Sequence, residues 1–344
     1  MLDSLQYLRA IASIMVVCFH VHVQLERMDY HGWWPASLAS GVDLFFIISG
    51  FLMLVTTTNR TGYTLTFYQK RLVRIVPLYW IITSLFVFLM LVVPSAVQSG
   101  RPELWHIIAS YLFLPAQHPV FPTIEPVVIP GWTLNYEMFF YLVWGLVLLL
   151  PDRMRVAAII ALFAGLVLLG ALMPSPNVML TFYTSTLIIE FIFGVMVGLW
   201  YLQGRALSVA VAWALLLVGF AAMLAINDVT PQMRFLLWGL PAAMIVIGAL
   251  ALEKAGAVRK YPVFVLLGDA SYSIYIVHGI ALSAAGQIWR KWVPADLPGG
   301  IAVFTIGAIL AAVAAGVVVH FTIERPLLRL MTRRPKARVA PSLP

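Results

Sequence analysis

Long apolar runs separated by short polar segments dominate the chain. Ten of these runs approach or reach the roughly 20 residues that an α-helix needs to cross a bilayer. They lie at 6–25, 40–56, 75–94, 132–150, 155–173, 183–202, 207–226, 234–252, 263–284 and 301–322. The stretch 104–115 is apolar but too short to span, so we expect it to be interfacial or re-entrant. The pattern predicts an all-α, polytopic membrane protein with about ten transmembrane helices.

The composition supports this prediction and excludes several other classes of protein. Of 344 residues, 62% are hydrophobic and only 10% are charged, against about 25% charged in a typical soluble domain. A soluble enzyme, a disordered chain and a nucleic-acid-binding domain are therefore disfavoured, and the lipid bilayer is the expected partner. The single cysteine, Cys18, excludes a cysteine-based metal site, and no metal-binding motif is present, so we expect no metal.

The positions of the positive charges predict an orientation. With a cytoplasmic N-terminus, 16 of the 22 Lys and Arg residues fall in inner segments and 5 in outer segments. Because positive loops stay in the cytoplasm, this bias predicts that both termini are inside and accounts for the net charge of +8. We expect a membrane domain over 1–328 and a basic, disordered tail over 329–344 at the inner lipid surface.

Four titratable groups are predicted at similar depth in the outer half of the membrane, each on a different helix: His20, Asp43, Glu137 and His278. A charge inside a membrane is costly, so each is a candidate functional residue. A histidine with nearby carboxylates is what general-base catalysis on a hydroxyl requires. For each residue alone a structural hydrogen bond between helices is the better explanation, but four such groups at one depth favour a site, and we predict His20, Asp43 and Glu137 as catalytic groups and His278 as a substrate-binding residue.

Arginines supply the second set of candidates. Arg9 and His20 are eleven residues apart, so on a helix they share one face about 16 Å apart. They either line one cavity or are a snorkelling arginine and a hydrogen-bonded histidine. Arg71 and Arg74 precede the third predicted span and also share a helical face. They can clamp phosphates or serve as ordinary inner-loop charge.

Several segments, in order along the chain, resemble the acyltransferase-3 family of bacterial inner-membrane O-acyltransferases. The resemblance runs from Leu2 to about Leu328 and is closest to the acetyl-transfer proteins of exopolysaccharide pathways. An arginine, ten residues and a histidine match the family pattern at Arg9 and His20. The segments that carry the rest are 2–10, 41–52, 71–79, 132–137, 271–278 and 324–327.

The resemblance implies transfer of an acyl group, usually acetyl, from cytoplasmic acyl-CoA to a sugar hydroxyl of a surface or lipid-linked polysaccharide. It implies that Arg71 and Arg74 bind the CoA phosphates and that Arg9 lines the donor channel. It further implies that His20 is the catalytic base or a transient acyl carrier. Glu137 would be the partner of His20 or a ligand of the acceptor.

Two questions stay open on the sequence alone. Trp132 and Tyr136 can stack on sugar rings, but interfacial aromatic belts explain them equally well. The polar groups within the membrane also allow a transporter or flippase of a lipid-linked glycan, or a non-catalytic partner in polysaccharide export. The lack of an internal repeat argues against the transporter.

Overall fold

The computed structural model describes residues 2–60, 62–93, 100–294 and 297–332. Within these ranges the chain is helical and contains no strand, only an isolated bridge between Gln117 and Ile124. The predicted all-α class is therefore confirmed. The predicted tail begins inside the last helix, α14 (Arg325–Thr332), and its residues 333–344 lie outside the described part.

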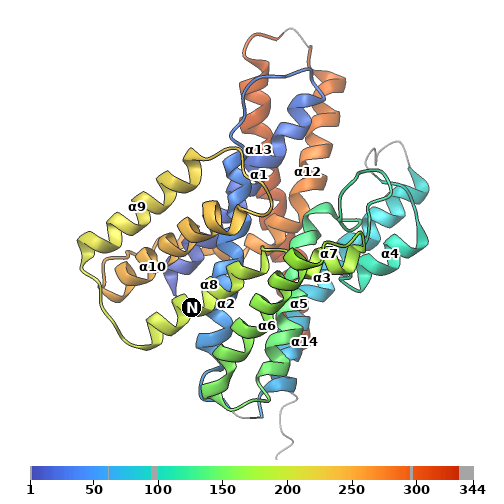
Figure 1. Cartoon of the computed structure of the whole chain (residues 1–344). Coiled ribbons are helices and arrows are strands. Elements are labelled where there is room, and N and C mark those ends of the chain that lie inside the picture. Colours follow the sequence, from blue (N-terminus) through green and yellow to red (C-terminus); the bar gives the residue numbers. More distant parts are fainter. Residues whose placement is uncertain (1, 61, 94–99, 295–296, 333–344) are drawn as a thin grey trace, which may run out of the picture.

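Every predicted apolar run forms a helix over most of its length (Figure 1). The first half of the chain contains α1 (Asp3–Glu26), η1 (Ala36–Ser40), α2 (Gly41–Thr57), α3 (Thr64–Val92), α4 (Leu104–Tyr111), η3 (Ile129–Gly131), α5 (Trp132–Val147) and α6 (Asp152–Leu172). The second half contains α7 (Val178–Tyr183), α8 (Ile188–Leu202), α9 (Val209–Ala225), the π-helical turn η4 (Phe235–Gly239), α10 (Leu240–Lys254), α11 (Pro262–Asp269), α12 (Ser271–Trp292), α13 (Gly300–Val319) and the π-helical turn η5 (His320–Glu324) before α14.

In the described part, seven helical segments are long and apolar enough to cross a membrane. An eighth is added if α11 and α12 are one span, although they meet at an angle of 69°. The other two predicted spans correspond to the shorter helices α5, with 16 residues, and α9, with 17. The chain is thus a multi-pass membrane protein.

Two predicted boundaries are wrong in a way that affects the site. Helix α3 begins at Thr64 and not near residue 75, so Arg71 and Arg74 lie inside the helix. The predicted span 263–284 is broken after Asp269, and its second part continues to Trp292. Asp269, the last residue of α11, accepts a hydrogen bond from the Gln6 side chain.

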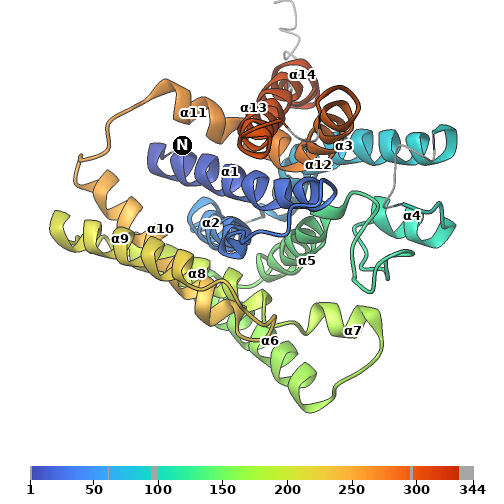
Figure 2. The same ribbon diagram turned by 90° about the horizontal axis from the view of Figure 1, so that it is seen from above.

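Helix α1 lies in the middle of the helical assembly. Figure 2 shows it between α2 on one side and α11 to α13 on the other, and α1 contacts all four of these helices. The side chain of Glu253 from α10 holds its first turn: the two carboxylate oxygens accept the backbone N–H groups of Asp3 and Ser4, both at 2.9 Å. A carboxylate here neutralises the positive end of the helix dipole. Residues along α1 are thereby placed at the centre of the molecule.

Small residues bring helices close together around this centre. An added Cβ at Gly50 of α2 would lie 2.2 Å from the Phe191 carbonyl oxygen of α8, and one at Gly194 would lie 2.2 Å from that of Ile47. Such reciprocal contacts between glycines are the usual way in which membrane helices approach closely. The α2–α8 pair therefore fixes the position of α2, which carries Asp43 and Ser49.

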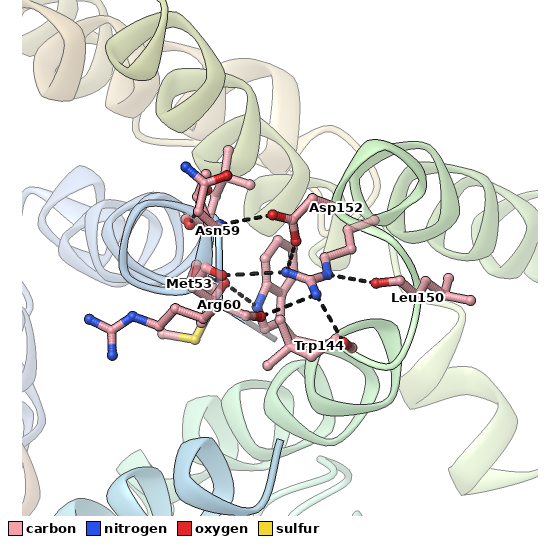
Figure 3. A network of polar contacts seen from close by, with 11 residues as sticks. Met53, Asn59, Arg60, Trp144, Leu150 and Asp152 are labelled. Atoms are coloured by element: carbon pink, nitrogen blue, oxygen red, sulfur yellow. Dashed lines mark hydrogen bonds and ion pairs between the residues drawn. The ribbon is translucent and has the colours of Figure 1, made fainter. Parts of the chain in front are cut away.

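At one end of the helices, Arg155 joins two loops through hydrogen bonds. Figure 3 shows this network, with Arg60, Leu150 and Asp152 labelled. The Arg155 guanidinium donates to the carbonyl oxygens of Thr57, Arg60, Leu148 and Leu150 at 3.0 to 3.4 Å. It also forms an ion pair with Asp152, which accepts the Asn59 backbone N–H at 2.8 Å. Every polar side of this arginine is occupied, so its role is to hold the α2–α3 and α5–α6 connections together.

Candidate active site

A cavity of about 150 Å³ lies between α1, α2, α3, α5 and α12. It brings together the three predicted arginines and one of the predicted carboxylates, which come from separate parts of the sequence. The polar side chains that line it include Arg9, Ser49, Arg71, Arg74, Glu137 and Ser271.

Arg9 is buried in this cavity with only 8% of its surface exposed. Its guanidinium donates to the Ser271 hydroxyl at 2.9 Å and, weakly, to the Gln6 amide oxygen at 3.4 Å. Both acceptors are neutral, and the ion pairs of the described residues include none to Arg9. A buried guanidinium without a carboxylate partner is costly, so an anionic ligand is the natural complement.

Arg71 and Arg74 reach the same cavity from α3. The Arg71 guanidinium lies 5.6 Å from the ring centre of Phe67 and 5.5 Å from that of Tyr141. Its Nε atom is buried and has no hydrogen-bond partner among the described residues. The aromatic rings orient this guanidinium while leaving donors available. The spacing prediction that Arg71 and Arg74 share a face is confirmed, since both line one cavity.

Glu137 is the carboxylate of the cavity. One of its oxygens accepts the Ser49 hydroxyl at 2.8 Å and the Tyr141 hydroxyl in a shorter contact. Among the described charged residues that line the cavity, three guanidiniums therefore face one carboxylate. The excess of positive charge suits a ligand with several negative charges, such as a phosphorylated nucleotide.

His20 and His278 form a pair next to the cavity. Their ring centres lie 4.8 Å apart. His20 Nδ1 lies 2.9 Å from the Val16 carbonyl oxygen, and His278 Nδ1 lies 2.6 Å from that of Tyr275. Because a carbonyl only accepts, each Nδ1 carries the proton and each Nε2 carries a lone pair. This is the tautomer that a general base requires.

Tyr275 connects the histidines to the cavity. It lines the cavity, and its ring centre is 5.9 Å from that of His278. Its hydroxyl is fixed by the Pro130 carbonyl at 3.0 Å and the Thr133 hydroxyl at 2.9 Å. His278 is fully buried, and its Nε2 has no partner in the described part of the chain. The arrangement places an anion site and a base on either side of one tyrosine.

Asp43 has a different environment from the other predicted carboxylate. It is fully buried and forms a two-bond ion pair with Arg234, with Oδ2–Nη2 at 2.8 Å and Oδ1–Nε at 3.1 Å. Arg234 also lies 4.9 Å from the ring centre of Trp238 and 5.8 Å from that of Trp132. Arg234 was not predicted as a site residue, because an arginine at the outer end of a predicted span is typical of loop charge. The sequence signal that could have identified Arg234 is its position directly before an apolar run that contains aromatic residues.

The two predicted sugar-stacking residues belong to an aromatic cluster. Tyr136 is buried, and its ring stacks on Phe182 with centres 3.8 Å apart. Trp132 packs edge to face against Tyr136 and Phe46 and is half-buried. One face of Tyr136 is thus already occupied by protein, whereas Trp132 retains some exposed surface.

The chain matches a known family model over nearly its whole length. Residues 2–320 match the model of the acyltransferase-3 family, which is described as an acyltransferase domain. The chain belongs to the acyltransferase-3 family. It is therefore an acyltransferase, and the resemblance inferred from its motifs is confirmed.

Named relatives of this acyltransferase agree with the assignment. The exopolysaccharide production protein ExoZ of Rhizobium meliloti (strain 1021) is 36% identical over 298 residues, which cover 85% of this chain and 90% of the relative. The acyltransferase MdmB of Streptomyces mycarofaciens and nodulation protein 10 of Rhizobium leguminosarum bv. viciae are each 25% identical, over 99% and 96% of this chain and 95% and 94% of the relatives. No solved structure matches the chain.

Proposed function

We propose that this acyltransferase moves an acetyl group from acetyl-CoA to a hydroxyl of a polysaccharide outside the cytoplasm or of its lipid-linked precursor. The observation that carries the proposal is the cavity in which three arginines face one carboxylate, with a histidine pair beside it. The relative from Rhizobium meliloti is named for exopolysaccharide production, which supports a polysaccharide as the acceptor.

The proposal includes a topology. It places ten spans in the bacterial inner membrane, counting α5, α9 and the bent α11–α12 pair, with both termini in the cytoplasm. The distribution of Lys and Arg over the loops supports this orientation. In it, Arg9 lies in the inner part of α1 and His20 in the outer half, so donor and acceptor approach the site from opposite sides.

In this account the CoA phosphates bind to Arg9, Arg71 and Arg74. The unpartnered Nε of Arg71 and the neutral partners of Arg9 leave guanidinium donors for them. Arg9 and His20 are about 16 Å apart along α1. The flexible pantetheine arm of CoA can extend over such a distance and carry the thioester to the histidine.

His20 acts as the base in the transfer step. Its Nε2 lone pair takes the proton from the acceptor hydroxyl while that oxygen attacks the thioester carbonyl carbon. The carbon–sulfur bond then breaks, and the CoA thiolate leaves and takes the proton back from His20. His278, in ring contact, holds the orientation of His20. Glu137 orients the polar groups of the cavity through Ser49 and Tyr141.

The test uses purified protein in lipid nanodiscs, labelled acetyl-CoA and de-O-acetylated polysaccharide. His20→Ala is expected to lower the transfer rate by about 10²- to 10⁴-fold, the usual contribution of a general base. His22→Ala is the matched control, because His22 lies on another face of α1 and pairs with Glu26 and Trp34. An undiminished transfer rate in a well-folded His20→Ala protein would contradict the proposed mechanism.

A further inference from the structure

A second, larger cavity lies away from the arginines. It has a volume of about 590 Å³ and lies between the loop after α4 and the α6–α7 connection, at the side of the molecule where Figure 1 labels α4 and α7. Residues 115–119 and 176–179 form its walls together with Glu103 and Trp105. This volume falls in the range of small-molecule binding sites, and the transfer step described above does not use it.

The loop that builds one wall is held in one conformation by its own hydrogen bonds. His106 Nε2 donates to the Glu125 carbonyl at 2.8 Å, and the Val127 N–H donates to the Ser110 hydroxyl at 2.9 Å. His118 Nδ1 accepts the backbone N–H groups of Val120 and Phe121 at 3.2 and 3.1 Å. A long ordered loop of this kind is usually a functional one, and its order means that the cavity is preformed.

The lining combines an aromatic face with planar hydrogen-bonding groups. Trp105 is 52% exposed although it lines the cavity. The lining also includes Glu103, Asn177 and Gln117, whose Nε2 donates to the Phe121 carbonyl at 3.3 Å and whose amide oxygen is the remaining acceptor. The Asn177 Oδ1 accepts the Leu180 N–H at 3.1 Å, so a ligand would meet its Nδ2 donors. An indole packs on the C–H face of a sugar ring, while carboxylate and amide groups pair with adjacent hydroxyls.

The same loop contacts Tyr275, which in turn contacts the histidine pair. It continues into η3, where the Pro130 carbonyl accepts the Tyr275 hydroxyl, and the Tyr275 carbonyl in turn accepts the His278 Nδ1–H. The loop that walls the cavity is therefore linked through Tyr275 to the histidine pair, which lies on α1 and α12.

We propose that this cavity binds a sugar residue of the acceptor polysaccharide at some distance from the hydroxyl that is acylated. The identification of the sugar as part of the acceptor rests on the proposed function; the sugar site itself does not. Trp105 supplies the stacking surface, and Glu103, Gln117 and Asn177 recognise the hydroxyls.

The competing explanation for an exposed tryptophan is anchoring in the lipid interface. Leu104, Ile108 and Leu112, spaced four residues apart, are 74%, 41% and 58% exposed and form an apolar stripe on α4 that continues into the turn after it. Trp105 lies at the edge of this stripe and also lines the cavity, whereas Leu104 does not. A substitution of Trp105 therefore affects both the cavity and the lipid-facing stripe, whereas a substitution of Leu104 affects the stripe alone.

The experiment measures binding and transfer on the same nanodisc preparations. Saturation-transfer NMR reports binding of de-O-acetylated oligosaccharides from the host polysaccharide and of neutral gluco- and galacto-oligosaccharides. Transfer is followed with labelled acetyl-CoA. Trp105→Ala and Asn177→Ala are expected to weaken oligosaccharide binding about tenfold while CoA binding stays unchanged. Trp105→Phe retains an aromatic face and should restore most of the binding, and Leu104→Ala should match the unaltered protein.

The outcomes separate the two proposals. Binding that is unchanged in both Trp105→Ala and Asn177→Ala, or equally reduced in Leu104→Ala, overturns the sugar site. Absence of oligosaccharide binding to the unaltered protein overturns it as well. Binding that depends on Trp105 without any acetyl transfer supports the sugar site and contradicts the proposed function.

Discussion

Two buried clusters of arginine and carboxylate lie in this acyltransferase, and they differ in how the charges are balanced. Arg234 is matched by Asp43 through two hydrogen bonds and by two tryptophan rings. In the cavity between α1, α2, α3, α5 and α12, the arginine cavity, Arg9 and Arg71 are held by hydroxyl, amide and aromatic groups, and the cavity carboxylate, Glu137, is bound to Ser49 and Tyr141. In the first cluster the fold itself pairs Arg234 with Asp43, while Glu190 beside them is fully buried and keeps both carboxylate oxygens unpartnered among the described residues. In the second cluster the arginines outnumber the one carboxylate, so positive charge is in excess.

Whether a buried arginine has a carboxylate partner within the fold distinguishes structural from functional arginines better than residue type does. Arg155, saturated by carbonyl groups and Asp152, belongs with the first cluster (Figure 3). A buried guanidinium pays a large desolvation cost that an ion pair recovers within the fold. Where the fold does not supply that pair, as at Arg9, a bound anion can. The following substitutions test this distinction.

The largest effect is expected at the Asp43–Arg234 pair. Asp43→Ala removes the carboxylate that is hydrogen-bonded to Arg234 and leaves only Glu190 beside this buried arginine, which should lower the free energy of unfolding by about 3 to 5 kcal/mol. Thermal unfolding in detergent measures the loss. The double variant Asp43→Leu/Arg234→Met removes both charges and should recover most of it. A single Asp43→Ala variant as stable as the unaltered protein would show that the ion pair is not structural.

In the arginine cavity, a substitution is expected to affect ligand binding and not stability. Arg9→Met breaks no ion pair, so its unfolding midpoint should stay close to that of the unaltered protein. It should nevertheless raise the KM for acetyl-CoA at least tenfold, because a hydrogen bond between charged groups contributes about 1.5 to 3 kcal/mol. The KM of Arg9→Lys for acetyl-CoA should lie between those of the unaltered protein and Arg9→Met. Severe destabilisation by Arg9→Met with an unchanged KM would assign this arginine to the fold.

A smaller effect is expected at His278. His278→Ala removes the ring beside His20 while leaving the His20–Val16 hydrogen bond in place. We expect kcat to fall about tenfold with little change in KM for either substrate, since a misplaced base affects the transfer step more than binding. Steady-state kinetics give this split. An equal loss in KM with normal kcat would indicate substrate binding instead.

The smallest effect concerns the ordered loop and pH. Burial, with a further contribution from His106, lowers the pKa of His118 from 6.5 to about 4. Because the pKa is lower in the folded state, the loop is fully stable above about 6.5 and loses stability as the pH falls toward 4. Hydrogen exchange of residues 112–128, corrected for intrinsic rates, should increase between pH 7 and 5. His118→Asn should remove this dependence, and equal protection at both pH values would contradict it.

The sequence predicted the helices but not the lateral neighbours of the polar groups. Period and hydropathy located the helices, and the eleven-residue spacing placed Arg9 and His20 on one helix. Pairing between Asp43 and Arg234 joins residues 191 positions apart, and no local pattern encodes such a contact. The predicted start of α3 was wrong because the polar residues around Arg71 interrupt the apolar run. Pro77 lies inside α3 and does not end the helix.

The unpaired arginines are proposed to bind the phosphates of CoA. Isothermal titration of coenzyme A into the His20→Ala protein, which retains the cavity but cannot complete the transfer, tests this binding most directly. We predict saturable binding that Arg71→Gln weakens at least tenfold without lowering the unfolding midpoint. Equal affinity with and without Arg71, or no binding at all, would contradict the account.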